Sequence, residues 1–133
     1  MVRDGDGNLI FSNEKGQAFL REVWQRRAGA STSSPAGETS LRCDALGCIY
    51  RSQDRTVAFI KDTAAFAEDC AMADVIVSWT TIRNGRCIGP ALRIDRRALA
   101  AGGGHALWLT TDEPPRVEAV RDSRGNRPWS ALR

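Results

Sequence analysis

The stretch R-T-V-A-F-I-K-D-T-A-A-F-A-E-D-C-A-M-A-D-V-I-V-S, residues 55–78, decides the fold of this chain. Its first six residues, Arg55–Ile60, are rich in branched and aromatic side chains and predict a β-strand. A helix capped by Asp62 or Thr63 follows this strand. The apolar run Val75–Val77 then shows no alternation with polar residues, which is typical of a strand buried on both faces. A strand, a helix and a buried strand in this order indicate an α/β fold.

The flanking segments predict further strands. Residues 41–51 contain two short strands around the turn 44–47, and Leu92–Ile94 forms another strand after an irregular connection. Three consecutive glycines break the chain before a strand at His105–Thr110, and a last strand near Val117–Val120 leads into a turn. We therefore expect a mixed β-sheet with a few helices.

The N-terminal residues predict a separate small unit. Residues 1–29 contain a strand hairpin around an Asp-Gly-rich turn and then a helix, whose Phe19, Leu20, Val23 and Trp24 form one apolar stripe. We expect this stripe, including Trp24, to belong to the core. Residues 30–40 contain no large apolar side chain and predict a flexible loop, so residues 41–133 form the main body.

Length and composition limit the class of protein. The chain has 133 residues, of which 42% are hydrophobic and 26% charged, as in one globular domain or a part of a larger one. No apolar run approaches the roughly 18 residues of a membrane span. The net charge of +3 is too small to make nucleic-acid binding the default function.

Four cysteines allow three complete pairings. Their spacing, C-x4-C followed by two isolated cysteines, matches a zinc site poorly, and disulfides or buried free thiols are the other interpretations. If the buried strand and the next strand are parallel neighbours, Cys70 and Cys87 lie at the same sheet edge, while Cys43 and Cys48 flank a tight turn. This geometry predicts the disulfides Cys43–Cys48 and Cys70–Cys87, which imply an oxidising compartment such as the periplasm.

A series of motifs resembles a known family. In order and approximate spacing, the motifs resemble the C-terminal part of the ComEC family of DNA-internalisation competence proteins from proteobacteria with high-GC genomes. They are C-D-A-L-G-C at Cys43–Cys48, A-E-D-C-A-M-A-D-V-I-V-S at Ala67–Ser78, C-I-G-P-A-L-R-I-D-R at Cys87–Arg96, G-H-A-L-W-L at Gly104–Leu109 and R-G-N-R-P-W at Arg124–Trp129.

The resemblance implies a location and a set of partners. ComEC proteins carry transforming single-stranded DNA across the inner membrane, and their C-terminal part is a metallo-β-lactamase-like domain that faces away from the cytoplasm. This chain would be the later portion of that domain, located in the periplasm as part of an inner-membrane protein. Its partners would be the rest of that membrane protein and single-stranded DNA.

The metal site of the metallo-β-lactamase superfamily is not carried over to this chain. Its H-x-H-x-D-H loop does not occur, and the single histidine, His105, cannot supply a two-metal site. His105 is interpreted as a structural residue or as a late ligand completed by upstream residues. Asp44, Asp69 and Asp95 could form a carboxylate cluster, but caps and turns explain them equally well. We therefore expect no catalytic residue, no metal and no cofactor in this chain.

The basic C-terminal tail is the candidate nucleic-acid contact. Arg121, Arg124 and Arg127 could neutralise phosphates, and a base could stack on Trp129. The alternative is that the segment around Trp129 docks onto the body of the protein.

Three functions follow. The first is a non-catalytic extracytoplasmic C-terminal domain of a DNA uptake channel with a degenerate active site. The alternative is half of a metal-dependent nuclease or phosphodiesterase domain that needs upstream ligands. A third is an unrelated periplasmic binding module with a closed core.

Overall fold

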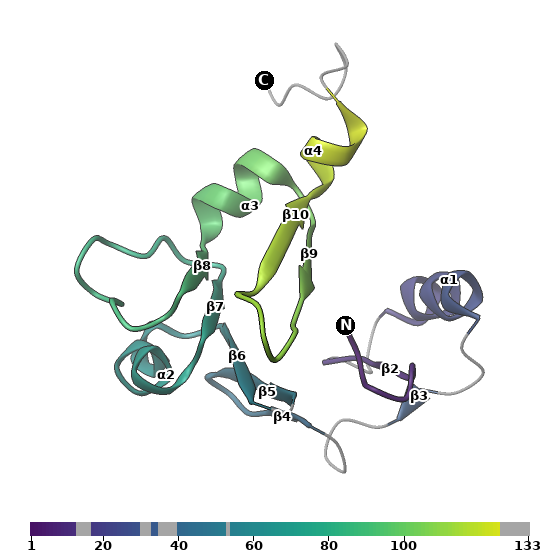
Figure 1. Cartoon of the computed structure of the whole chain (residues 1–133), viewed down its shortest axis with the longest axis horizontal. Coiled ribbons are helices and arrows are strands. Elements are labelled where there is room, and N and C mark those ends of the chain that lie inside the picture. The colour runs from purple at the N-terminus through teal and green to yellow at the C-terminus, as the bar shows by residue number, and fades with distance from the viewer. Residues whose placement is uncertain (13–16, 30–32, 35–39, 53, 126–133) are drawn as a thin grey trace.

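A mixed five-stranded sheet forms the body of the protein in the computed structural model, which describes residues 1–12, 17–29, 33–34, 40–52 and 54–125 (Figure 1). Across the sheet lie, in order, β4 (Leu41–Cys43), β5 (Gly47–Ser52), β6 (Arg55–Ile60), β7 (Val75–Ser78) and β8 (Leu92–Ile94). The first three strands pair antiparallel, whereas β6, β7 and β8 pair parallel. The expected α/β class and the parallel pairing of β7 with β8 are confirmed.

The connection between β6 and β7 covers one face of the sheet. It forms a 3-10 turn, η1 (Thr63–Ala65), and the helix α2 (Phe66–Met72). The carboxylate of Asp62 caps η1 by accepting a backbone N–H at 2.9 Å, as the sequence predicted. Phe66 and Cys70, one turn apart, are both buried and pack α2 onto the sheet.

The central strands contribute side chains to both faces of the sheet. Ala58, Ile60 and Ile76 pack with α2 on one face. Val57 and Val75 belong to a second cluster on the opposite face, which the N-terminal and C-terminal hairpins cover. All five side chains are buried, so the expectation of a β7 strand buried on both faces is confirmed.

The N-terminal hairpin packs on this second face. Strands β1 (Val2–Arg3) and β2 (Leu9–Ile10) pair antiparallel, and the carboxylate of Asp4 holds the turn by accepting two backbone N–H groups at 3.1 and 2.7 Å. Ile10 is fully buried and joins the sheet's core cluster. Within residues 30–40, the described residues Ser33–Ser34 form β3, which pairs parallel to β2.

Helix α1 (Ala18–Ala28) follows the hairpin and ends at Gly29, whose φ of 65° lies in the left-handed region. None of its residues is buried. The expectation that its apolar stripe belongs to the core is therefore wrong, since Phe19, Leu20 and Trp24 are 75%, 50% and 46% exposed. The spacing of apolar residues predicts which of them share a face but not what covers that face.

The C-terminal part adds two short helices and a hairpin. Helix α3 (Arg96–Gly102) leads into β9 (His105–Trp108), which pairs antiparallel with β10 (Arg116–Ala119). The sequence did not predict α3, and the turn expected after β10 is instead the short helix α4 (Val120–Arg124). No helix in the described ranges has the length and apolar content to cross a membrane.

Arg55 fixes the C-terminal hairpin to the sheet. Its guanidinium donates to the carbonyl oxygens of Thr110, Thr111 and Glu113 at 3.3, 3.4 and 3.1 Å. The same side chain lies 3.6 Å from the carboxylate of Asp74, which precedes β7. One arginine on β6 therefore ties the connection between β9 and β10 to the central strands.

Candidate functional site

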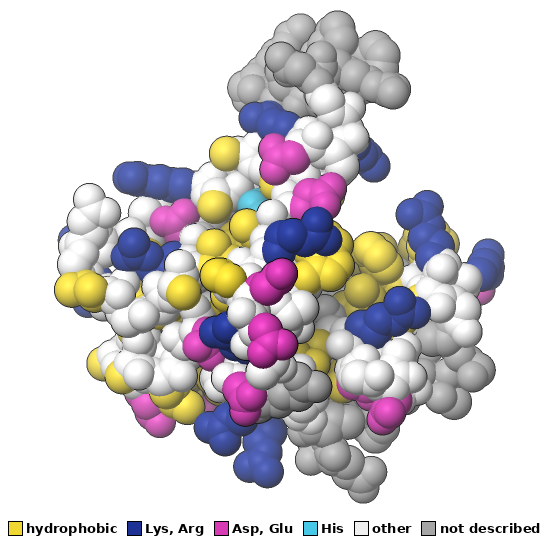
Figure 2. Space-filling view, viewed as in Figure 1, with side chains coloured by type: hydrophobic (Ala, Val, Ile, Leu, Met, Phe, Trp, Pro, Cys, Tyr) yellow, Lys and Arg dark blue, Asp and Glu magenta, His cyan; other side chains and the backbone are white. Residues whose placement is uncertain are grey.

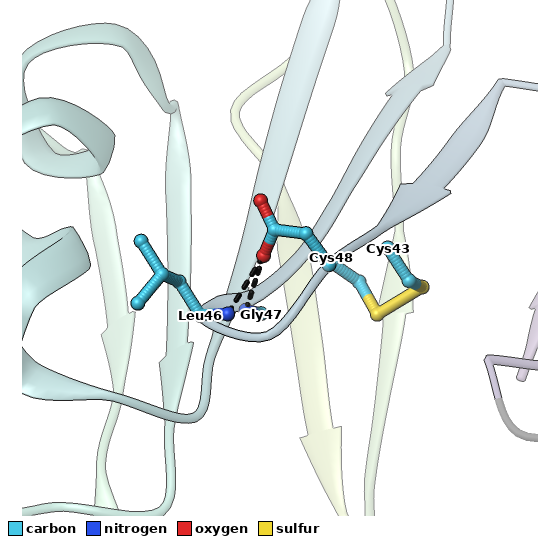
Figure 3. The surroundings of a disulfide bond; sticks show 5 residues. Cys43, Leu46, Gly47 and Cys48 are labelled. Carbon is cyan, nitrogen blue, oxygen red and sulfur yellow. Dashed lines mark hydrogen bonds between the residues drawn. A yellow bond between two sulfur atoms is a disulfide. The ribbon is translucent and has the colours of Figure 1, made fainter.

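The first disulfide closes the turn between β4 and β5. Cys43 and Cys48 lie opposite each other in the strand register, with their Cα atoms 4.0 Å apart (Figure 3). Between them, the carboxylate of Asp44 accepts the backbone N–H groups of Leu46 and Gly47 at 2.8 and 2.9 Å. The carboxylate of Asp44 thus stabilises the turn that brings the two cysteines together.

The second disulfide joins α2 to the connection between β7 and β8. Cys70 and Cys87 are 8% and 1% exposed, and their Cα atoms are 5.3 Å apart. All four cysteines are paired, in the arrangement expected from the sequence. Two disulfides indicate an oxidising, extracytoplasmic compartment.

His105 is held by its own chain. Its Nδ1 lies 2.8 Å from the carbonyl oxygen of Gly103, and because a carbonyl only accepts, Nδ1 donates. The ring packs against Gly102, where an added Cβ would lie 2.9 Å from the ring carbon Cε1. Within the described residues, no group of three His, Cys, Asp or Glu side chains is arranged to hold a metal ion.

Asp95 caps helix α3. Its Oδ1 accepts the N–H groups of Arg97 and Ala98 at 2.9 and 3.1 Å, and its Oδ2 accepts that of Ile82 at 3.1 Å. Partial burial opposes ionisation, but the hydrogen bonds from Ala98, Ile82 and Arg97 outweigh it and lower the pKa of the Asp95 carboxyl. The carboxylate of Asp95 therefore links α3 to the connection between β7 and β8, residues 79–91.

Two of the three candidate carboxylates share a shallow hollow. Asp44 and Asp69, together with Glu68, line a depression of about 540 Å³ between the β4–β5 turn and α2. Burial, followed by the negative charges of Glu68 and Asp44, raises the pKa of the Asp69 carboxyl. Asp95 is not among the residues that line this hollow, so the structure does not bring the three aspartates together.

The candidate nucleic-acid residues lie at the end of the described chain. Arg121 and Arg124 are exposed on α4. Arg127 and Trp129 lie outside the described residues. Two of the four candidate residues therefore lie on α4, the helix that follows the C-terminal hairpin (Figure 1).

A larger cleft lies between the N-terminal unit and the C-terminal hairpin. Its volume is about 820 Å³, within the range of ligand sites. In Figure 2, hydrophobic side chains gather in the hollow between the hairpin and the α1 unit, with basic side chains on both sides. Apolar residues from three parts of the fold line the cleft, among them Leu20 and Trp24 of α1, Tyr50 and Phe59 of the sheet, and Leu107 and Trp108 of β9.

Sequence reasoning missed this cleft and the part that Trp108 plays in it. The relevant signal is the pair of apolar segments at 19–24 and 107–109, of which the first was expected in the core and the second was predicted only as part of a strand. The exposed fractions of Trp24 and Trp108, 46% and 40%, show that the space between the two segments is open.

Comparisons of the chain with protein-family models, with curated proteins and with solved structures found no match.

Proposed function

We propose that this chain is a non-catalytic, extracytoplasmic C-terminal domain of a DNA uptake channel of the ComEC type, and that it belongs to an inner-membrane protein. In this function it completes a degenerate metallo-β-lactamase-like domain next to the pore. The ordered series of motifs from Cys43 to Trp129 is the reason for choosing this family.

The pairing of all four cysteines is the observation that carries the extracytoplasmic part of the proposal. Free cysteines are good ligands for zinc and good nucleophiles, but a cysteine in a disulfide is neither. The two bridges hold the β4–β5 turn and the 79–91 connection, and both are structural in this interpretation.

The local bonding of the other candidate groups supports a non-catalytic role. The carboxylates of Asp44 and Asp95 accept backbone N–H groups, and the Nδ1 atom of His105 donates to Gly103. A hydrolytic pair of metal ions needs several converging ligands, and these side chains are distributed over different parts of the fold.

The rival interpretation is half of a metal-dependent nuclease or phosphodiesterase domain. The hollow that Asp44, Glu68 and Asp69 line is the observation that favours it, because carboxylates are ligands for hard divalent ions. Among the described residues these three are not by themselves arranged to hold an ion, so the rival needs further ligands from the upstream half. Metal analysis separates the two. For a non-catalytic domain, we expect substoichiometric zinc and manganese, and no cleavage of single-stranded DNA with added Mn²⁺, in a purified oxidised protein that extends this chain by the upstream half of the domain, because the rival needs ligands from that half. Stoichiometric metal together with cleavage, abolished by Asp44→Asn and Asp69→Asn, would establish the rival.

The channel function is tested in a transformable strain that encodes the parent membrane protein. Deletion of the region corresponding to residues 41–125 is expected to reduce transformation frequency sharply, while an immunoblot shows the truncated channel in the membrane. Undiminished transformation with the truncated channel present would contradict the proposal.

Single-stranded DNA is the proposed partner, contacted by Arg121 and Arg124 together with Arg127 and Trp129. Since phosphate contacts release counterions, the affinity is expected to fall steeply with salt. Changing the three arginines to alanine together is expected to weaken binding of a labelled oligothymidylate in a low-salt titration. Equal affinity of this variant and the natural chain would exclude the tail as the contact.

A further inference from the structure

The cleft between α1 and the C-terminal hairpin is open on its apolar side. Leu20 and Trp24 of α1 line it and are 50% and 46% exposed, and Trp108 of β9 lines it and is 40% exposed. The side chains of Phe59 and Tyr50 reach the cleft from the sheet. Apolar side chains on opposite sides of one cleft are thus left in contact with water, which favours burial by a ligand.

Strand β9 turns toward this cleft the edge that no other described strand pairs with. Five consecutive residues, 105–109, line the cleft, and Figure 1 shows β9 on the α1 side of the hairpin, with β10 on the far side. Within the described part of the chain, β10 is the partner strand of β9. A strand edge of this kind presents main-chain donors and acceptors that another strand can bond.

The hydrogen-bond pattern between β9 and β10 determines which main-chain groups of β9 face away from β10. Val120 donates its N–H to the carbonyl oxygen of Gly104 at 2.8 Å, and in an antiparallel pair the bonded residues then recur at every second position. Ala106 and Trp108 therefore direct their N–H and C=O groups toward β10. His105 and Leu107 direct theirs toward the cleft.

The charged residues around the cleft determine which charged residues a ligand should carry. Arg3 and Arg21 line the cleft, and the guanidinium of Arg116 lies 4.0 Å above the ring of Trp108. Asp4 also lines the cleft, and its carboxylate accepts hydrogen bonds from its own turn, while the guanidinium of Arg3 donates to the carbonyl oxygens of Gly7 and Ala28. Arg21 and Arg116 are therefore the cations that a ligand would meet. The net positive rim complements acidic side chains.

We propose that the cleft binds one extended segment of a partner protein, which adds as a strand to the free edge of β9. Its apolar side chains, at alternate positions, pack on Phe59, Leu20 and Trp24, and acidic side chains between them face Arg21 and Arg116. Main-chain hydrogen bonds to His105 and Leu107 supply the affinity, and the alternation supplies the specificity. This inference does not depend on the proposed channel function.

The test uses the full oxidised chain and a capped heptapeptide, T-V-E-V-E-V-T, followed by amide NMR and hydrogen exchange. We expect the amides of His105 and Leu107 to shift and become protected, whereas those of Ala106 and Trp108, already bonded to β10, change little. The peptides T-V-E-P-E-V-T, which lacks one N–H, and T-E-V-V-V-E-T, which has the same composition without alternation, are expected to bind at least about fivefold more weakly.

Matched variants locate the site. Arg21→Glu is expected to weaken binding by about fivefold, while Arg27→Glu, the same change on the same helix away from the cleft, leaves it within about twofold. Trp24→Ala is expected to weaken it and Trp79→Ala, an exposed tryptophan elsewhere, to leave it unchanged.

Three results would overturn the proposal. They are the absence of any shift at millimolar peptide, equal binding of the scrambled peptide, and sedimentation that shows a dimer which Trp24→Ala dissociates.

Discussion

Loss of the Cys70–Cys87 disulfide is expected to destabilise the protein more than loss of Cys43–Cys48. Part of a disulfide's stabilisation comes from restricting the unfolded chain and grows with the length of the loop that it closes. The two sequence separations are 17 and 5 residues. The chain-entropy relation then gives about 3 kcal/mol for the longer loop and about 2 kcal/mol for the shorter one.

Burial increases the difference. Cys70 and Cys87 are both buried, whereas in the other pair Cys48 is buried and Cys43 is exposed. Truncating two buried side chains to alanine leaves unfilled space in the core next to α2, which adds about 1 kcal/mol. The expected losses in the free energy of unfolding are thus about 4 kcal/mol for Cys70→Ala with Cys87→Ala and about 2.5 kcal/mol for the other pair, in which only Cys48 is buried.

Urea unfolding followed by tryptophan fluorescence measures both losses. With a denaturant slope of about 1.5 kcal/mol/M, the midpoint is expected to fall by about 2.7 M for the Cys70–Cys87 pair and about 1.7 M for the Cys43–Cys48 pair. Reduction of the natural protein by dithiothreitol is the control and is expected to lower its midpoint below that of either variant. Equal midpoints for the two variants, or a lower one for the Cys43–Cys48 variant, would refute this reasoning.

Three further changes test single contacts. Asp95→Ala is expected to cost about 2 kcal/mol of unfolding free energy at pH 7, and Asp95→Asn less than half of that, because asparagine also caps helices. Since folding lowers the pKa of Asp95, the stability that its carboxylate contributes is present above the unfolded-state pKa and is lost as the pH falls through the folded-state pKa. The unfolding midpoints of the Asp95→Ala variant and the natural protein should therefore converge in acid. Arg55→Ala is expected to cost about 1 kcal/mol and to make residues 110–115 susceptible to limited proteolysis, whereas Arg93→Ala leaves that segment resistant. Gly47→Ala is expected to cost about 2 kcal/mol in thermal unfolding, since the added Cβ would overlap the carbonyl oxygen of Phe59, and unchanged stability would show that the strands separate freely.

The central sheet could be predicted from the sequence because its signals are local. The strand expected at Arg55–Ile60 has the same bounds in the structure, and the buried run at 75–77 lies in β7. The disulfide pairing followed from one further inference, the parallel pairing of β7 with β8. Each step needed only side-chain patterns and the geometry of adjacent elements.

The candidate site could not be predicted in the same way. The apolar stripe at 19–24 is identical in sequence whether another element covers it or water does, and its exposure depends on the distant hairpin at 105–119. Helix α3 was missed because the glycines at 102–104 suggested a break, although Asp95 before a run of good helix formers is an N-terminal signal. Asp44 and Asp69 meet in one hollow through the packing of α2, which no local pattern encodes.

The change from antiparallel to parallel pairing at β6 has a consequence for how the chain matures. Strands β4, β5 and β6 are consecutive hairpin partners of low contact order, while β7 and β8 reach their places through crossovers and must wait for longer loops to close. Cys43 and Cys48 therefore meet early, when the meander forms, and Cys70 and Cys87 meet late. Formation of the Cys70–Cys87 disulfide during biogenesis is therefore expected to mark a molecule in which the parallel strands β6, β7 and β8 have already paired.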